Sequence, residues 1–297
     1  MNKSLFASLC LAAIGLLASA ITPAAIHNNF VAEQSRTPTG GRSLQVLVAQ
    51  AEIKSNINPS NIALYTGGGL LGALIEAGVD SSHAKKAEAA IQPVRGALTG
   101  YDADALAVST SNAALAEVPW FQSRSSAFAK DTSVLGKSAL LDASTTDQVA
   151  FFEYSYDASP DCSSIRVAVN MQLANKAVPD GKKPDARLAA RFLAYAQSIT
   201  SVVSLPSPAM EATDNATRWS ADNGKLARRA LAAGFVTLQG LIPRALGLSE
   251  ADLASMNGHD KKFGLLGGFR GRIQEVNAGG GMLYTGTQLV HVQTLSE

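Results

Sequence analysis

Three glycines in the first third of the chain have the spacing of a dinucleotide-binding turn. Gly67, Gly69 and Gly72 lie in the stretch TGGGLLGALIEAGVD and match the pattern G-x-G-x-x-G. Such a turn binds a pyrophosphate only where it follows a buried strand and where a second strand ends at an acidic residue about 20 positions on. The second strand is missing here, because Asp80 and Glu88 lie in or beside helix-prone sequence. We therefore expect no cofactor, neither a nicotinamide nor a flavin nucleotide.

The same stretch also has the spacing of a close-packing surface on a helix. Its small residues recur every four positions and so lie on adjoining rows, which let another helix or a sheet approach closely: Gly68 and Gly72, then Gly69, Ala73 and Ala77. An oligomer seam and a membrane-inserting hairpin are the alternatives. Glu76 interrupts the apolar run, which favours burial inside the protein's own fold.

Other residue types that carry chemistry are scattered along the chain. Cys162 lies in the polar turn SPDCSS beside Asp161, whose charge raises a thiol pKa, so we interpret it as an incidental loop cysteine. No paired zinc-ligand spacing links the four histidines, which are His27, His83, His259 and His291. The patterns G-x-S-x-G, S-x-x-K with S-D-N, and H-E-x-x-H are absent from the sequence. We expect no metal site and no catalytic residue, and a hydrolase or transferase with an unfamiliar site stays open as the alternative.

A basic stripe on the longest predicted helix is the candidate partner-binding surface. Arg218, Lys225 and Arg229 fall at positions i, i+7 and i+11, and Trp219 lies beside the first of them. Most such stripes are solvated helix faces. Binding of an acidic partner or a glycan is the functional alternative.

The first 20 residues have the three parts of a secretory signal peptide. Lys3 precedes an apolar run from about Leu5 to Leu17, and Ala18-Ser19-Ala20 forms a small-x-small cleavage site. The run is shorter than the roughly 20 residues of a membrane-spanning helix, so no stable membrane span is expected. Leu9 precedes Cys10 where a lipoprotein signal has Gly or Ala, which disfavours lipidation. We expect export to the periplasm, with association with the outer membrane left open.

Composition excludes several classes of partner. The chain has 297 residues with 25 Lys and Arg against 24 Asp and Glu, and removal of Lys3 with the signal peptide leaves 24 against 24. A net charge near zero gives no electrostatic case for nucleic acid or an anionic membrane. Residues of hydrophobic type make up 46% of the chain, enough for a sizeable core. Cys162 is the one cysteine left after cleavage, so no internal disulfide can form.

Residues 21–42 mix Pro, Gly, Asn and Ser without a sustained period and predict a flexible leader. A single α+β domain is expected over residues 43–297, with a mostly antiparallel sheet packed against several helices. Its first strand starts at Leu44, and the stretches QVAFFEYSYD and SIRVAVNMQL predict a hairpin turning at Pro160 and Asp161. FLAYAQSITSVVSL favours another strand because its second half is β-branched.

Helices are expected in three regions. Two or three should lie between residues 67 and 116, with an interruption or kink at Pro93 and a stop and new cap at Gly100 and Asp102. An amphipathic helix should run over 217–242 and end or kink at Pro243, and Ser249 should cap a short sequel. The last 30 residues predict a hairpin turning at 277–281 and a final strand over 288–293.

The order of three segments resembles a family of uncharacterised exported proteins and lipoproteins of proteobacteria. These segments are the glycine-rich GGGLLGALIEAGVD run, the hairpin FEYSYDASPDCSSIRVAV, and Trp219 followed by an Ala-rich helix. The resemblance covers most of the mature chain and implies a bacterial envelope location. It implies no activity and no site residues, because no activity is agreed for that family.

Two functions from different classes remain at this point. The first, which we favour, is a periplasmic binding or envelope-assembly factor that engages an envelope protein through sheet edges and the Trp219 helix. The second is the enzyme with an unfamiliar site. A deep pocket with converging titratable groups favours the enzyme, whereas an apolar or edge-strand surface favours binding. The oligomeric state is left open.

Overall fold

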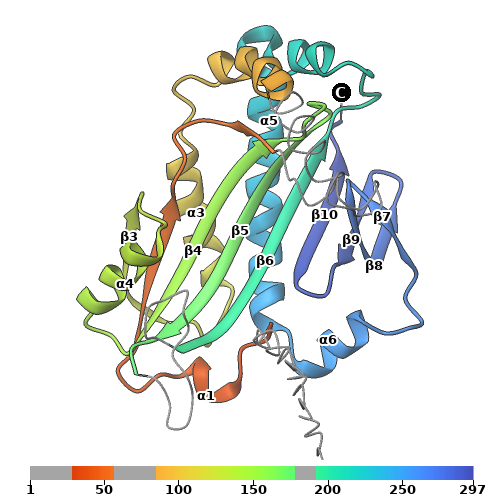
Figure 1. The fold of residues 1–297 in the computed structure, drawn as a ribbon. Coiled ribbons are helices and arrows are strands. Elements are labelled where there is room, and N and C mark those ends of the chain that lie inside the picture. Colours follow the sequence, from red (N-terminus) through yellow and green to blue (C-terminus); the bar gives the residue numbers. More distant parts are fainter. Residues whose placement is uncertain (1–28, 57–84, 178–191, 297) are drawn as a thin grey trace, which may run out of the picture.

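The computed structural model describes residues 29–56, 85–177 and 192–296, and Figure 1 shows their fold. Their strands form one ten-stranded sheet in the order β3-β1-β4-β5-β6-β10-β9-β8-β7, with β2 beside β4. The strands are β1 (Arg42–Val48), β2 (Lys54–Ser55), β3 (Ser123–Ala129), β4 (Gln148–Ala158), β5 (Ser164–Asn175), β6 (Phe192–Ser204), β7 (Phe263–Leu266), β8 (Phe269–Asn277), β9 (Gly280–Tyr284) and β10 (Gln288–Thr294). The helices are α1 (Glu33–Arg36), α3 (Ala103–Ala116), α4 (Val134–Ala143), α5 (Ala212–Gly247) and α6 (Glu250–Met256), and residues 85–97 are also helical.

The expected α+β class is confirmed, but the expectation of a mostly antiparallel sheet is wrong. The sheet is mixed: β1 pairs in parallel with both β3 and β4, β10 pairs in parallel with β6, and β2 pairs in parallel with β4. Parallel neighbours require long crossover connections. The chain supplies them, because α3 lies between β1 and β3, and α5 and α6 lie between β6 and β10.

The central hairpin is confirmed. β4 and β5 pair antiparallel from Gln148 opposite Asn175 to Ala158 opposite Ile165, across the turn that contains Pro160. β6 continues the meander antiparallel to β5. The predicted C-terminal hairpin of β8 and β9 and the final strand β10 are also present.

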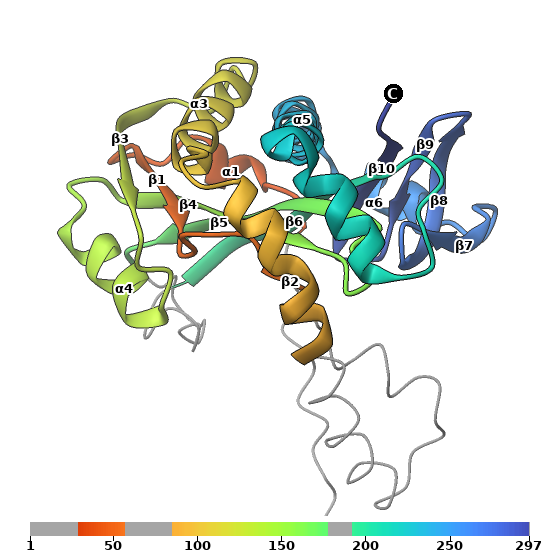
Figure 2. The same cartoon turned by 90° about the horizontal axis from the view of Figure 1, so that it is seen from above.

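One face of the sheet carries the main core. Figure 2 shows α3 and α5 side by side above this face. α5 packs on β5 and β6, and α3 packs on β1 and on α5. The contact of α5 with β5 is close at Gly234, where an added Cβ would lie 2.5 Å from Val167 Cγ2. Tyr154 reaches across to α3, where its hydroxyl lies 2.8 Å from Ser111 Oγ.

The other face has two smaller apolar clusters. Leu141 of α4 packs there against Leu47, Val149 and Phe151. Near the opposite edge, Val202, Val290 and Val292 pack with Leu266 and Phe269 of the β7–β8 hairpin. α4 therefore lies beside the β3 edge and the hairpin lies at the far edge (Figure 1).

α5 departs from its predicted course in two ways. It continues through Pro243 to Gly247, so of the two expectations for Pro243, an end or a kink, the end is wrong. It breaks instead near its start, where Asp222, Asn223 and Gly224 have positive φ. Asp, Asn and Gly are the residues that tolerate this conformation best. Pro93 likewise lies inside the helical residues 85–97.

The described part of the predicted leader packs on the domain. Val31 is buried, and the side-chain amide of Asn29 donates to Tyr284 Oη and to the Gly286 carbonyl. The chain enters β1 at Arg42, two residues before the expected start. The predicted signal peptide (residues 1–20) lies outside the described residues.

Three predicted helix caps and stops are confirmed. Asp102 caps α3 by accepting from the Ala105 N–H, after Gly100 in positive φ. Ser249 and Asp252 form a capping box at α6.

α5 is the one helix among the described residues that is long and apolar enough to cross a membrane, judged by length and composition. Half of its most apolar window is buried inside the fold. Its buried side chains, among them Phe235, Leu238 and Ile242, belong to the main core. These contacts account for the apolar character of the helix.

Candidate functional site

β3 forms one end of the sheet, and no described strand pairs with its outer edge. Residues Ser125–Ala129 lie in regular register with Ser43–Leu47 of β1, after an irregularity at Arg124. All residues of β3 except Ala129 are exposed. Folded proteins protect edge strands with proline, charge or bulges, because unpaired N–H and C=O groups accept another strand. Here the irregularity and the charged residues lie at the two ends, at Arg124 and at Lys130 just after the strand. The residues in the middle of the strand carry no charge.

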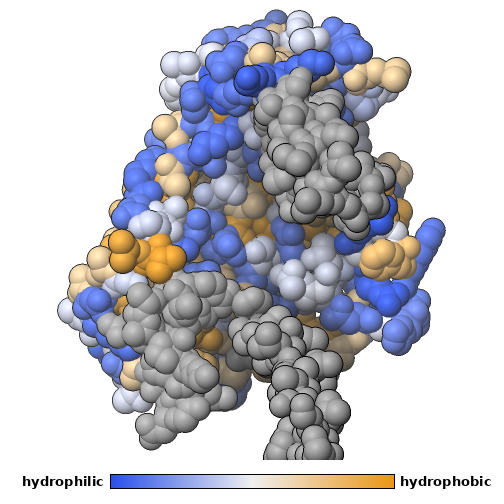
Figure 3. Space-filling view, in the orientation of Figure 1, coloured by the Kyte–Doolittle hydropathy of each residue, from blue (hydrophilic) through white to orange (hydrophobic). Residues whose placement is uncertain are grey.

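A groove runs between β3 and α3. Phe128 faces it from β3, and Val108, Ala105 and Asn112 line it from α3, with Asp102 and Asp104 at one end. The groove is shallow and open to solvent, with a volume of about 470 Å³. Phe128 is 40% exposed, and Val134 and Leu135 of α4 are exposed nearby in sequence. Figure 3 shows the opposite, α4-bearing face of the sheet, where apolar side chains also gather near this edge. We call the groove between β3 and α3 the β3 groove.

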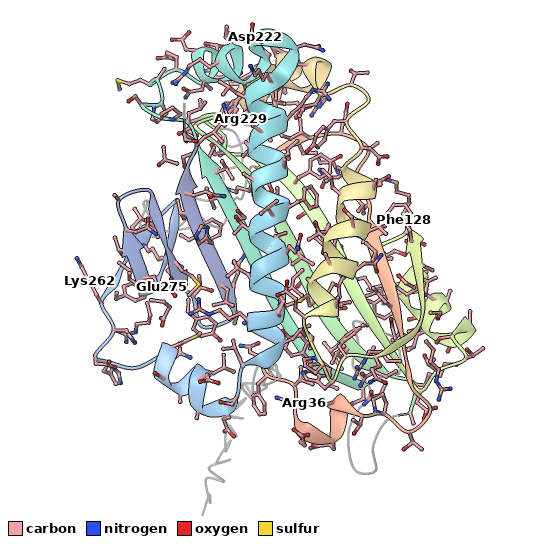
Figure 4. All side chains as sticks on the ribbon, turned by 180° about the vertical axis from the view of Figure 1, so that it is seen from behind. Arg36, Phe128, Asp222, Arg229, Lys262 and Glu275 are labelled. Atoms are coloured by element: carbon pink, nitrogen blue, oxygen red, sulfur yellow. The ribbon has the colours of Figure 1, made fainter. Side chains whose placement is uncertain are left out.

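A second cleft lies at the start of β3 and contains three arginines. It encloses about 530 Å³, and its lining includes Arg36, Arg42, Trp120, Gln122, Ser123 and Arg124. α1 supplies Arg36, the first residue of β1 supplies Arg42, and β3 supplies Arg124. We call it the arginine cleft. Figure 4 labels Arg36 beside α1 and Phe128 on β3, toward opposite ends of this side of the molecule.

Arg42 is the buried centre of this cleft, with 1% of its surface exposed. Its Nε donates to Gln148 Oε1 at 2.5 Å, and its Nη2 donates to the carbonyls of Ser35 and Arg36 at 2.7 and 3.1 Å. The guanidinium carbon lies 5.0 Å from the Trp120 ring centroid, within the range of a cation–π contact. Neutral groups and aromatic faces therefore hold this cation.

The charge of Arg42 is not neutralised by a carboxylate of the described residues. Burial lowers the pKa of Arg42 to about 10, so the side chain stays protonated at neutral pH. Arg36 pairs at 3.5 Å with Glu33, whose side chain is largely exposed. A desolvated cation is costly unless an anion compensates it, and none of the carboxylates in the described part of the chain pairs with Arg42. The cleft is consequently suited to an anion.

The glycine-rich packing candidates cannot be placed. Gly68, Gly69, Gly72, Ala73 and Ala77 all lie outside the described residues, and so do His27 and His83.

The structure does not bring the predicted basic stripe together. Residues 221–224 are non-helical, so Arg218 is not in helical register with Lys225 and Arg229. Arg218 donates to the carbonyls of Pro206 and Ser207, and Arg229 donates to the carbonyl of Ser296. The assumed helical register is wrong because it required an unbroken helix across ADNG, although Asn-Gly is a turn signal. Partner binding by these residues stays a prediction.

Trp219 is a core residue and not a surface contact. Its side chain is fully buried, and its Nε1 donates to the Cys162 carbonyl at 2.7 Å. Cys162 itself is buried in the β4–β5 turn, with φ of 51°. Burial, and then the charge of Asp161, raises the pKa of the Cys162 thiol to about 11. The expected direction of this pKa shift is confirmed, while burial is the larger cause.

Sequence reasoning missed the arginine cleft. Arg36 and Arg42 were assigned to the leader, and Trp120 and Arg124 lie in a segment for which no element was predicted. The four residues come from two stretches that lie far apart in the sequence, so no local spacing marks them. Within the described ranges, no group of three or more His, Cys, Asp or Glu residues is arranged to hold a metal ion.

Together these features define a mixed α+β domain with an exposed edge strand between an apolar groove and a cationic cleft. No protein-family model, no curated protein and no solved structure matches the chain.

Proposed function

We propose that this protein is an exported binding factor of the cell envelope that acts through protein–protein contacts. Its site is the outer edge of β3, to which an extended segment of a partner protein adds as a further strand. Backbone hydrogen bonds supply affinity in this mode of recognition, and pockets for alternate side chains supply specificity. The observation that carries the proposal is the exposed, regular edge from Ser125 to Ala129.

The β3 groove supports the same mode of binding. Alternate side chains of an added strand point to one face of the sheet. On the α3 face they would enter the space between Phe128 and Val108. The expected partner segment is extended and carries an apolar residue at the position that faces Phe128.

The other end of the sheet is less suited to this role. β7 has four residues against the seven of β3. Lys261 and Lys262 precede it, and the guanidinium of Arg272 lies 5.8 Å from the Phe263 ring. These charges protect an edge strand against pairing. Phe263, which is exposed on β7, provides a matched control for Phe128.

A peptide selection tests the binding function. Random heptapeptides with free C-termini are selected on the mature protein, and the affinities of the selected peptides are measured by calorimetry. We expect Phe128→Ala to weaken binding roughly tenfold, because a large apolar contact is removed, and Phe263→Ala to leave it unchanged. Peptides that bind Phe128→Ala as well as the wild type would contradict the proposal.

Export has its own test. The sequence supports cleavage after Ala20, so N-terminal sequencing of the periplasmic protein should start at Ile21. A retained Met1, or a lipid on Cys10, would contradict the expected processing.

A further inference from the structure

We propose that the arginine cleft binds the free C-terminal carboxylate of the partner segment. The last residue of this segment would then lie opposite Ser123, and the segment would run antiparallel to β3. This inference rests on the proposed strand addition at β3. It names the chemistry of the partner: a protein C-terminus, not an internal loop.

The position of the cleft sets the direction. Ser123, Gln122 and Arg124 line it, so it lies where β3 begins. Phe128 and the β3 groove lie toward the other end of the strand. A strand that places its last residue at the cleft and its earlier residues along β3 must run opposite to β3. At about 3.3 Å per residue, Ser123 and Phe128 are roughly 17 Å apart, so the residue facing Phe128 is the sixth from the C-terminus.

The charges fit a carboxylate at this end. Arg42 contributes a buried positive charge, Arg36 lies at 5.6 Å from the same Trp120 ring, and Arg124 is exposed at the rim. Guanidinium groups match a carboxylate in both charge and planar geometry. At the opposite end of the groove Lys130 pairs with Asp104 at 2.6 Å, so its charge is compensated and the carboxylate is favoured at the arginine cleft.

The arginine cleft adjoins the β3 edge to which the partner segment would bind. The side chain of Arg124 lies against Gly41, because a Cβ added at Gly41 would be 2.4 Å from Arg124 Nε. Gly41 has φ of 80°, a conformation that side chains rarely adopt. This turn brings Arg42 to the same cleft as Arg124, which lies far from it in the sequence.

The first test compares the selected peptide as the free acid and as the C-terminal amide. We expect the amide to bind roughly tenfold more weakly, because charge-assisted hydrogen bonds are lost. Arg124→Gln should weaken binding of the acid and leave binding of the amide unchanged. Arg229→Gln, an exposed arginine elsewhere, is the matched control. Equal affinity of acid and amide would overturn the carboxylate inference and leave strand addition standing.

The second test uses a small probe that does not depend on strand addition. N-acetyl-leucine and N-acetyl-leucinamide are titrated on the full mature chain, with tryptophan fluorescence as the readout. We expect N-acetyl-leucine, but not N-acetyl-leucinamide, to change the tryptophan fluorescence. This change should disappear in Trp120→Phe and weaken in Arg124→Gln. A response to N-acetyl-leucine in a protein for which the selection yields no peptide that binds at β3 would overturn strand addition and retain the carboxylate site. Tighter binding of inorganic phosphate than of N-acetyl-leucine would overturn the carboxylate assignment.

Discussion

The two tryptophans have opposite roles at the scale of single residues. Trp219 is enclosed by the core and donates to a backbone carbonyl, whereas Trp120 lies half-buried against two arginines. Trp219 was expected at a surface because it adjoins Arg218, and Trp120 drew no prediction. Burial depends on which segments fold over a side chain, and adjacency in sequence does not report this.

Trp219→Phe should lower the free energy of unfolding by about 1–3 kcal/mol, because the Cys162 carbonyl loses its buried donor. Trp120→Phe is the control and should cost less, because this ring is partly exposed. Urea denaturation followed by circular dichroism measures both. A Trp219→Phe curve that overlays the wild type would contradict the buried hydrogen bond.

Asp157 should make stability depend on pH. Burial raises its pKa to about 6, against the lowering effects of Arg166 and Asn56. The folded state then holds the proton more tightly than the unfolded state, so the stabilising contribution is present below about pH 4 and is lost as pH rises through 6. At about 1.4 kcal/mol per pKa unit, the loss is roughly 2–3 kcal/mol.

Asp157→Asn removes this titration. The variant should gain stability relative to the wild type between pH 4 and pH 7, measured as a difference of denaturation midpoints at each pH. A difference that stays constant over this range would show that the carboxyl is not protonated in the folded protein near pH 5.

At the scale of elements, the break in α5 depends on one glycine. Gly224 has φ of 73°, and a Cβ there would lie 2.9 Å from the Ala97 carbonyl oxygen. Gly224→Ala should therefore destabilise the protein by about 1–3 kcal/mol. Gly240→Ala, at an exposed position of the same helix with open space around it, should stabilise it by up to about 1 kcal/mol. Thermal melts that shift in the same direction for both variants would contradict the break.

Local patterns predicted most elements correctly and failed where the backbone leaves its expected course. Alternation predicted β4, β5 and β10, and the Gly100 and Asp102 pair predicted the start of α3. The apolar periodicity predicted α5 correctly after Gly224. It also predicted an unbroken helix through Asn223 and Gly224, where the structure has a break. Pro243 was overrated as a stop because packing of α5 on the sheet overrides a local preference.

At the scale of the whole molecule, the sequence predicted the hairpin neighbours β4–β5 and β8–β9 but neither β3 nor the parallel neighbours. Alternation specifies which face of a strand is buried and says nothing about parallel or antiparallel pairing. β1 lies between β3 and β4, both parallel to it and both distant in sequence. The edge position of β3 and the arginine cleft follow from this arrangement. The candidate site could therefore not be derived before the fold was known.

The central claim is that β3 accepts an added strand, and amide hydrogen exchange of the mature protein with a selected peptide tests it most directly. Successive N–H groups of a strand point to opposite edges, so peptide binding should slow exchange at alternate amides between Ser125 and Ala129. The β7 amides over Phe263–Leu266 should be unchanged. Protection at β7, on α5 or elsewhere, with no change in β3, would contradict the account.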